Sequence, residues 1–243
     1  MNSPALVSIT FDDGFRCQFD KAVPILNRHG FPATFFLIAN QELTHDRWSR
    51  QHDTDWWKID WREDDIVMLK ELVQNGHEIG SHSVTHNPYV MQSQPEVEVR
   101  DSKRMIEDWI GMKVPSFCYP FYRSHSYLAH YVRSAGHEQA RGGGGILNGY
   151  VPRASYYAIP DGSLDRFNVD CRQISTGENV AGWVRPACWH VLTYHGIGDE
   201  RDGWAAITVN EFTRQMDELA KHRDSGDVEV VTFRDGASRF PRK

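Results

Sequence analysis

Cysteine is scarce in this sequence, because its 243 residues include only four. So few cysteines cannot form the dense disulfide framework of a small secreted domain, and no two of them have the C-x-x-C spacing of a structural zinc site. We expect them to be mostly buried, small apolar side chains. They are Cys17, Cys118, Cys171 and Cys188.

Further absences narrow the class of function. The formal net charge is −6 and no run of basic residues occurs, which argues against nucleic acid as a partner because that affinity depends on lysine and arginine. No apolar run is long enough to span a membrane. The first residues, MNSPALVSITFDDG, lack the features of a secretion signal. We expect a protein that works in the cytoplasm, or outside the cell if a leader precedes this sequence. Nothing indicates its oligomeric state.

The residues that are present suit one globular domain. The sequence is 40% hydrophobic and 25% charged, and 243 residues are a common length for a single α/β barrel. We therefore expect residues 1–243 to form one catalytic domain. Residues 40–62 are polar and rich in tryptophan, and so long a loop in a compact domain is typical of a lid or a binding surface.

Strand patterns and helix patterns alternate along the chain. Apolar, β-branched runs are followed by segments with apolar residues at helical spacing, and several of these segments end at glycine. Such alternation predicts a parallel sheet and favours a distorted (β/α) barrel of about seven parallel strands. Residues 140–187, with four consecutive glycines, give no clear pattern. The expected strands are 6–11, 33–39, 77–82, 116–120, 190–195 and 228–233, and the expected helices are 17–29, 63–76, 95–110, 125–135 and 209–223.

Three of the predicted strands end in polar clusters. Asp12 and Asp13 follow the first strand, His82 and His86 follow the third, and His195 ends a later one. Active sites of α/β barrels gather at this edge of the sheet. Two histidines four residues apart, combined with a distant carboxylate, form a set that binds a catalytic divalent ion and leaves positions open for water and substrate.

The motifs resemble those of the polysaccharide deacetylases of carbohydrate esterase family 4, the NodB homology domain. The hallmark motifs of that family, TFDDG and H-S-x-x-H, stand intact at residues 10–14 and 82–86, and LTYH at 192–195 is similar to its L-x-x-H motif. The resemblance implies one divalent metal ion, zinc or alternatively cobalt or nickel, held by Asp13, His82 and His86. It also implies hydrolysis of N- or O-linked acetyl groups on a carbohydrate by a water on that metal.

The same resemblance implies roles for the other two polar residues. Asp12 would be the general base and His195 the general acid. Neighbouring side chains on an extended strand point to opposite sides, so one carboxylate can bind the metal while the next stays free to accept a proton. Such hydrolysis also needs a group that stabilises the oxyanion.

The third family motif is altered in this chain. It reads FCYPFY at residues 117–122, with Cys118 where many relatives have the arginine that contacts the catalytic aspartate. We expect Arg172, in the segment NVDCRQI, to supply that cation, and Asp170 to tune His195 as the fourth motif's aspartate does. The backbone N–H of Phe121 would stabilise the oxyanion, and Tyr122 would narrow the cleft beside the substrate.

Two alternatives remain open. A relative with the same fold could hydrolyse a cyclic imide, a ureide or another small non-sugar amide. A second alternative is an inactive carbohydrate-binding module that uses the same cleft. The retention of Asp12, His195 and the three metal ligands argues against both.

Overall fold

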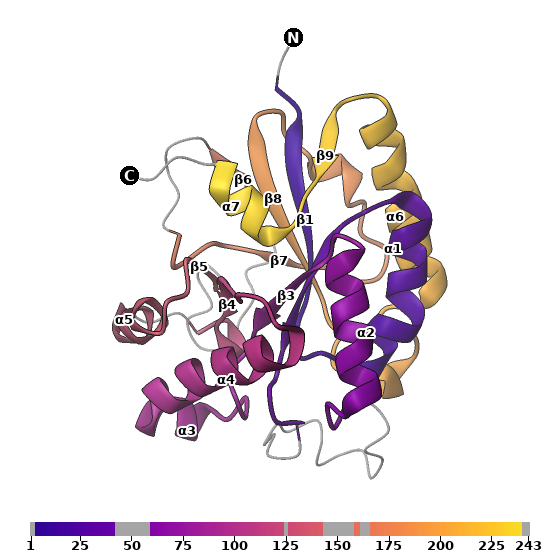
Figure 1. The fold of residues 1–243 in the computed structure, drawn as a ribbon. Helices are drawn as coiled ribbons and strands as arrows, with labels where there is room; N and C mark the ends of the chain where they lie inside the picture. The colour runs from indigo at the N-terminus through magenta and orange to yellow at the C-terminus, as the bar shows by residue number, and fades with distance from the viewer. Residues whose placement is uncertain (1–2, 42–58, 124–125, 143–157, 161–165, 240–243) are drawn as a thin grey trace.

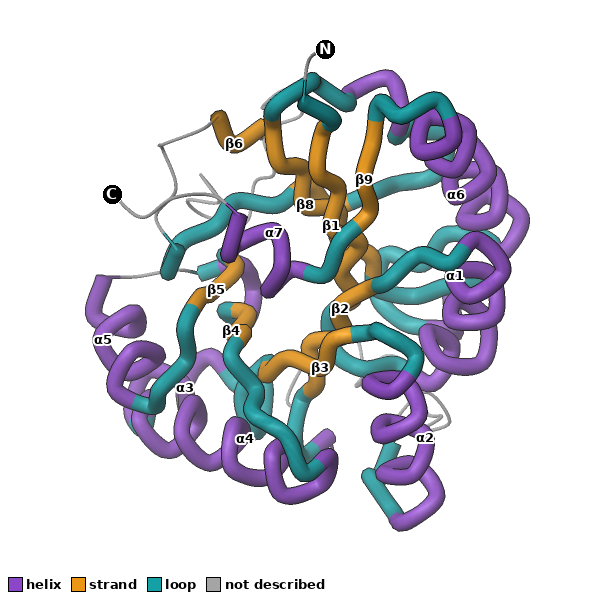
Figure 2. Tube along the Cα trace, turned by 45° about the horizontal axis from the view of Figure 1, so that its top comes forward, coloured by secondary structure: helices purple, strands orange, loops and turns teal. Residues whose placement is uncertain are grey.

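A computed structural model describes residues 3–41, 59–123, 126–142, 158–160 and 166–239 of the chain. Strands form an inner ring and helices surround it (Figures 1 and 2). The strands are β1 (Ala5–Phe11), β2 (Ala33–Leu37), β3 (Glu78–Ser81), β4 (Ser116–Cys118), β5 (Gln139–Arg141), β6 (Ala158–Pro160), β7 (Arg172–Gln173), β8 (Cys188–Tyr194) and β9 (Val228–Val230). The α-helices are α1 (Val23–His29), α2 (Glu63–Gln74), α3 (Pro88–Ser93), α4 (Pro95–Ile110), α5 (Ser126–Ser134), α6 (Val209–Asp224) and α7 (Phe233–Arg239).

The strands follow the order β5-β4-β3-β2-β1-β8, and β7 lies parallel beside β8. A single parallel bridge between Arg141 and Val169 joins the end of β5 to the segment that leads into β7. These seven strands therefore form a distorted parallel barrel, as the alternating pattern predicts. The other two strands are additions: β9 pairs with the start of β1, and β6 runs antiparallel to β8.

Local sequence explains where the helices begin and end. Helix α1 stops at Gly30 and α4 stops at Gly111, and both glycines adopt the left-handed conformation that ends a helix at little steric cost. The side chain of Thr208 accepts a hydrogen bond from the N–H of Glu211 and so caps the start of α6. No helix of the described residues is both long and apolar enough to cross a membrane.

Apolar side chains pack on both faces of the sheet. Alternate residues of β1 and β2, among them Ile9, Phe11 and Phe35, face the surrounding helices. A second group fills the barrel itself, where Trp189 packs against Phe233 of α7 with ring centroids 5.3 Å apart.

Helix α7 closes the barrel at the amino ends of the strands, and Figure 2 shows it inside the ring. Gly236 of α7 lies so close to Trp189 that a Cβ atom would come within 2.3 Å of the indole ring. The backbone N–H of Arg234 donates to the buried carboxylate of Glu78 at the start of β3. Asp12, His82 and His195 follow strands at the opposite, carboxyl end of the barrel.

Candidate active site

The polar clusters predicted from the strand ends meet at the carboxyl end of the barrel. Asp12 and Asp13 follow β1, His82 follows β3, and His195 follows β8. Strands β1 and β8 pair in parallel up to Phe11 and Tyr194, and the N–H of Asp12 donates to the carbonyl of Tyr194 at 3.0 Å. Residues far apart in the chain are thus brought into one buried cluster.

Asp13, His82 and His86 are arranged as ligands of a single cation. Oδ1 of Asp13 lies 3.5 Å from Nε2 of His82 and 3.6 Å from Nε2 of His86. These distances exceed those of normal N–H···O hydrogen bonds. Two ligand atoms bound to a tetrahedral zinc ion lie about 3.4 Å apart. The three residues therefore fit a divalent metal ion, and all are buried.

The surroundings orient these three side chains. Nδ1 of His82 lies 2.9 Å from the carbonyl oxygen of Cys118, a contact that directs Nε2 toward Asp13. The N–H of His86 donates to the hydroxyl of Ser83 at 3.0 Å. Asp13, Ser83 and His86 all have positive φ angles, which are costly for residues with a Cβ atom. The fold therefore holds strained backbone at this site.

The environment also sets the charge of two ligands. Burial opposes ionisation of Asp13, but the interactions with His82, His86 and His195 outweigh it and lower the pKa of Asp13 below its ordinary value. Burial lowers the pKa of His86 to about 4. An ionised carboxylate and a neutral imidazole are the forms that bind a metal ion.

Two buried glutamines hold the loop that carries the aspartates. Nε2 of Gln18 donates to the carbonyl of Asp12 at 2.6 Å and to that of His195 at 3.0 Å. Nε2 of Gln41 donates to the carbonyl of Asp13 at 2.7 Å. Gln18 lies in a short π-helical turn, a feature frequent near functional sites. Gln18 therefore connects the predicted base to the predicted acid through their backbones.

The cation beside Asp12 is Arg141, the last residue of β5. Its Nη2 contacts Oδ1 of Asp12, and both side chains are almost completely buried. Nη1 donates to the hydroxyl of Thr193 at 2.7 Å. The guanidinium therefore orients the carboxylate of Asp12 from the interior of the barrel.

Two thiols complete the contacts of Arg141. Nη2 lies 2.8 Å from Sγ of Cys118, and Nη1 lies 2.7 Å from Sγ of Cys171. Burial raises the pKa of Cys118, and it raises the pKa of Cys171 to about 11. Both thiols stay neutral, so Asp12 faces no competing anion on this guanidinium. Cys118 and Cys171 are buried in an apolar cluster as expected, and they also contact this guanidinium.

The structure places Arg141, and not the expected Arg172, beside Asp12. Arg172 belongs to β7 and donates to the carboxylate of Glu178, with Nη2 2.8 Å from Oε2. Side chains of neighbouring residues in an extended segment point to opposite faces. Cys171 points into the barrel toward Arg141, and Arg172 points outward to its own partner.

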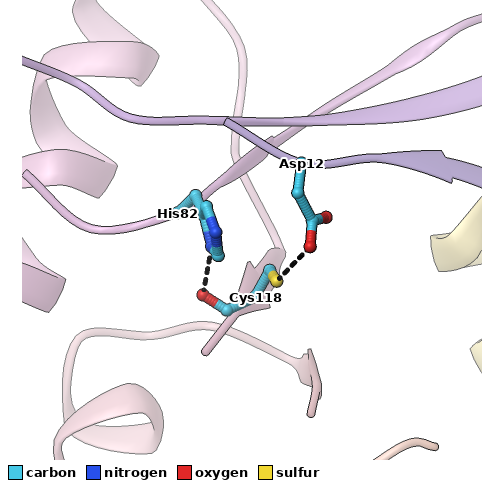
Figure 3. Close-up of side chains that lie close together, drawn as sticks. All are labelled: Asp12, His82 and Cys118. Carbon is cyan, nitrogen blue, oxygen red and sulfur yellow. Dashed lines mark hydrogen bonds between the residues drawn. The ribbon is translucent and has the colours of Figure 1, made fainter. Parts of the chain in front are cut away.

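Asp12, His82 and Cys118 form a second group whose ligand atoms lie close enough for a metal ion (Figure 3). Sγ of Cys118 lies 3.7 Å from Oδ2 of Asp12. The guanidinium of Arg141 already contacts both groups, however, and places a fixed positive charge there. This group therefore suits a metal ion less well than Asp13, His82 and His86 do.

His195 faces Asp12 across the site. Its Nε2 lies 3.7 Å from Oδ2 of Asp12. Burial lowers the pKa of His195, and Arg141 adds to this effect while Asp12 and Asp13 oppose it. Nδ1 is buried, and no described residue forms a hydrogen bond with it. The role of Asp170 in tuning His195 stays a prediction.

Known proteins resemble both the sequence and the fold. The polysaccharide deacetylase family matches residues 2–140. The chain belongs to this family. YxkH of Bacillus subtilis (strain 168), which is named for a polysaccharide deacetylase, is 30% identical over 121 residues, 49% of this chain and 37% of that protein. The match thus covers well under half of this relative.

Solved structures show the same fold at low identity. One is the Xyl-CE4 domain of a multidomain xylanase from the hindgut metagenome of Trinervitermes trinervoides, with TM-score 0.57, 16% identity and coverage of 98% of this chain and 91% of that one. Another is a family 4 acetyl xylan esterase of Clostridium thermocellum with a cobalt ion, with TM-score 0.54, 17% identity and coverage of 96% and 91%.

The third motif of this family member forms one wall of the site. The ring of Phe121 packs on His86 with centroids 4.3 Å apart. Among the described residues, none accepts a hydrogen bond from the N–H of Phe121. Tyr122 is buried beside His195 and Arg141. Phe121 and Tyr122 both have positive φ angles, 56° and 57°, which are costly for residues with a Cβ atom.

Several residues of the site were missed from the sequence, namely Arg141, Gln18 and Trp204. Trp204 lies 42% exposed, and its ring meets that of His195 edge-on at 4.6 Å. The sequence marks Arg141 only by its place directly before the run of four glycines. Of the tryptophans of the early loop, Trp61 packs in the core, and Trp48, Trp56 and Trp57 lie outside the described residues.

Proposed function

We propose that this protein is a metal-dependent hydrolase that removes acetyl groups from an N- or O-acetylated carbohydrate. The observation that carries the proposal is the convergence of Asp13, His82 and His86 with Asp12 and His195 at one end of the barrel. The family and the cobalt ion in the acetyl xylan esterase support a divalent metal. Zinc suits the two imidazoles and one carboxylate, as do cobalt and nickel.

A divalent ion held by Asp13, His82 and His86 would lower the pKa of water and polarise the acyl carbonyl. Asp12 accepts a proton as water attacks the carbonyl carbon, and Arg141 keeps its carboxylate oriented. The N–H of Phe121 donates to the oxyanion that develops on the former carbonyl oxygen. His195 delivers a proton to the leaving nitrogen or oxygen as its bond to carbon breaks. The products are acetate and the deacetylated sugar.

Acetate release tests this function. The protein is incubated with acetylated chitooligosaccharides, acetylated xylan and small cyclic imides, and released acetate is compared with imide hydrolysis. We expect acetate from at least one carbohydrate and no opening of the imides. Imide hydrolysis without acetate release would instead favour the amidohydrolase alternative.

Removal of the metal should abolish this activity. We expect chelation, verified by elemental analysis, to reduce acetate release to background, and zinc, cobalt or nickel to restore it. Circular dichroism before and after chelation serves as a control for unfolding. Full turnover by a protein shown to be metal-free would contradict the mechanism.

Trp204 should contribute to substrate binding, because its exposed ring lies next to His195. We expect Trp204→Ala to raise KM about three- to tenfold, the size of one aromatic stacking contact, with a smaller change in kcat. Met112, which is 50% exposed, gives the control variant Met112→Ala. Unchanged steady-state kinetics in Trp204→Ala would show that this ring only covers the histidine.

A further inference from the structure

A hollow of about 210 Å³ has Phe121 in its wall. Its lining combines residues from α3, from the third motif and from α5. Because the ring of Phe121 also packs on His86, one side chain separates this hollow from the predicted metal position. The hollow is smaller than the ~300 Å³ of the smallest typical ligand pockets, so it suits a single sugar residue. Its lining residues are Pro88, Met91, Gln92, Pro120, Phe121, Arg123, Tyr127 and Leu128.

The lining has the character of a carbohydrate subsite. Met91 and Leu128 are buried and form an apolar base. Phe121 and Tyr127 are 37% and 45% exposed, so their rings can contact the apolar faces of a sugar. Gln92 and Arg123 are exposed polar groups that can bind the substituents at its rim.

Arg123 is the one charged residue among those that line the hollow. Its guanidinium carbon lies 6.0 Å from the centre of the Phe121 ring. No described carboxylate forms a salt bridge with it, whereas Arg16, Arg100 and Arg172 each have such a partner. An exposed guanidinium held at an aromatic wall can bind a carboxylate through two parallel hydrogen bonds.

We propose that this hollow binds the sugar residue next to the one that is deacetylated, and that Arg123 selects a substrate whose neighbouring residue carries a carboxylate. The substrate class is then an acidic acetylated polysaccharide that contains uronic acid. This inference rests on the proposed deacetylase function. The formal net charge of −6 gives the protein no general attraction to an acidic polymer, so the preference must come from a local contact.

Two matched pairs of probes test the inference. Chitohexaose and a hyaluronan hexasaccharide both contain N-acetylglucosamine, but only the second carries carboxylates. Acetylated xylo-oligosaccharides with and without a glucuronic acid substituent form the O-acetyl pair. We expect the wild type to prefer the acidic member, and Arg123→Met to lose about tenfold in kcat/KM for that member through KM alone. The neutral member should be unaffected.

Further variants separate a specific contact from a change in net charge. Arg123→Lys should keep part of the preference. Arg104→Met, a substitution at an exposed residue of α4 that does not line the hollow, should keep all of it. The wild-type preference should shrink as sodium chloride is raised, because the contact is exposed.

Binding is also measured by calorimetry on the zinc-loaded protein, so that the inference is tested without turnover. Tighter binding of the acidic probe that is lost in Arg123→Met supports it. Equal affinities for acidic and neutral probes, unchanged in Arg123→Met, overturn it. Absence of acetate release from every probe refutes the proposed function alone, since the binding data still decide the role of Arg123.

Discussion

Replacing Asp12 with Asn should reduce kcat about 10²- to 10⁴-fold, the usual contribution of a general base, and leave one metal ion bound per chain. Asp13→Asn should instead lose the metal ion, because Oδ1 of Asp13 faces Nε2 of both His82 and His86. The two substitutions are chemically identical and adjacent in the chain. Turnover and metal content, measured by acetate release and elemental analysis, therefore distinguish proton transfer from coordination.

The control for this pair is Asp224→Asn, at an exposed carboxylate on α6. It should change neither quantity. Equal metal loss in Asp12→Asn and Asp13→Asn would show that the assignments of base and ligand are wrong. Loss of metal from Asp12→Asn alone would move the metal position to the group of Asp12, His82 and Cys118.

Replacing Arg141 with Met should destabilise the protein and impair turnover together. The guanidinium is fully buried and Asp12 nearly so, and removing one partner of a buried ion pair costs about 3–5 kcal/mol because the other charge stays buried. The carboxylate of Asp12 also loses the contact that orients it, so kcat/KM should fall on the order of 10²-fold. Urea denaturation and steady-state kinetics measure the two effects.

Arg172→Met is the matched control. Its partner Glu178 and its own side chain are both partly exposed, so the free energy of unfolding should fall by about 1 kcal/mol or less. If Arg141→Met does not fold, Arg141→Lys keeps the charge without the planar fork and should show an intermediate loss. A larger loss of turnover in Arg172→Met than in Arg141→Lys would show that Arg172, and not Arg141, supports Asp12.

The fold was predictable wherever one element carries a strong local pattern. The buried run at β1 and the amphipathic helices α2 and α6 follow from side-chain periodicity. Strands β5, β6 and β7 have only two or three residues, too few for any periodicity. They exist because neighbouring strands supply their hydrogen bonds.

Some residues of the candidate site can likewise be predicted from local sequence, and others cannot. Asp12, Asp13, His82, His86 and His195 occur in short motifs that stand at strand ends, so the sequence suffices to find them. Arg141 reaches Asp12 because the barrel closes, over a separation of 129 residues. The contact between Arg141 and Asp12 is therefore set by topology, and no local pattern around either residue predicts it.

The position of α7 determines where substrate enters the barrel and where products leave it. Phe233, Gly236 and Trp189 pack together at the amino end of the strands. The barrel is therefore closed at that end. A substrate therefore reaches Asp12 and His195 through the opposite, open end, and the products leave through the same end. Deleting α7 would open the barrel at both ends and expose its interior, including Phe36 and Trp189, to solvent.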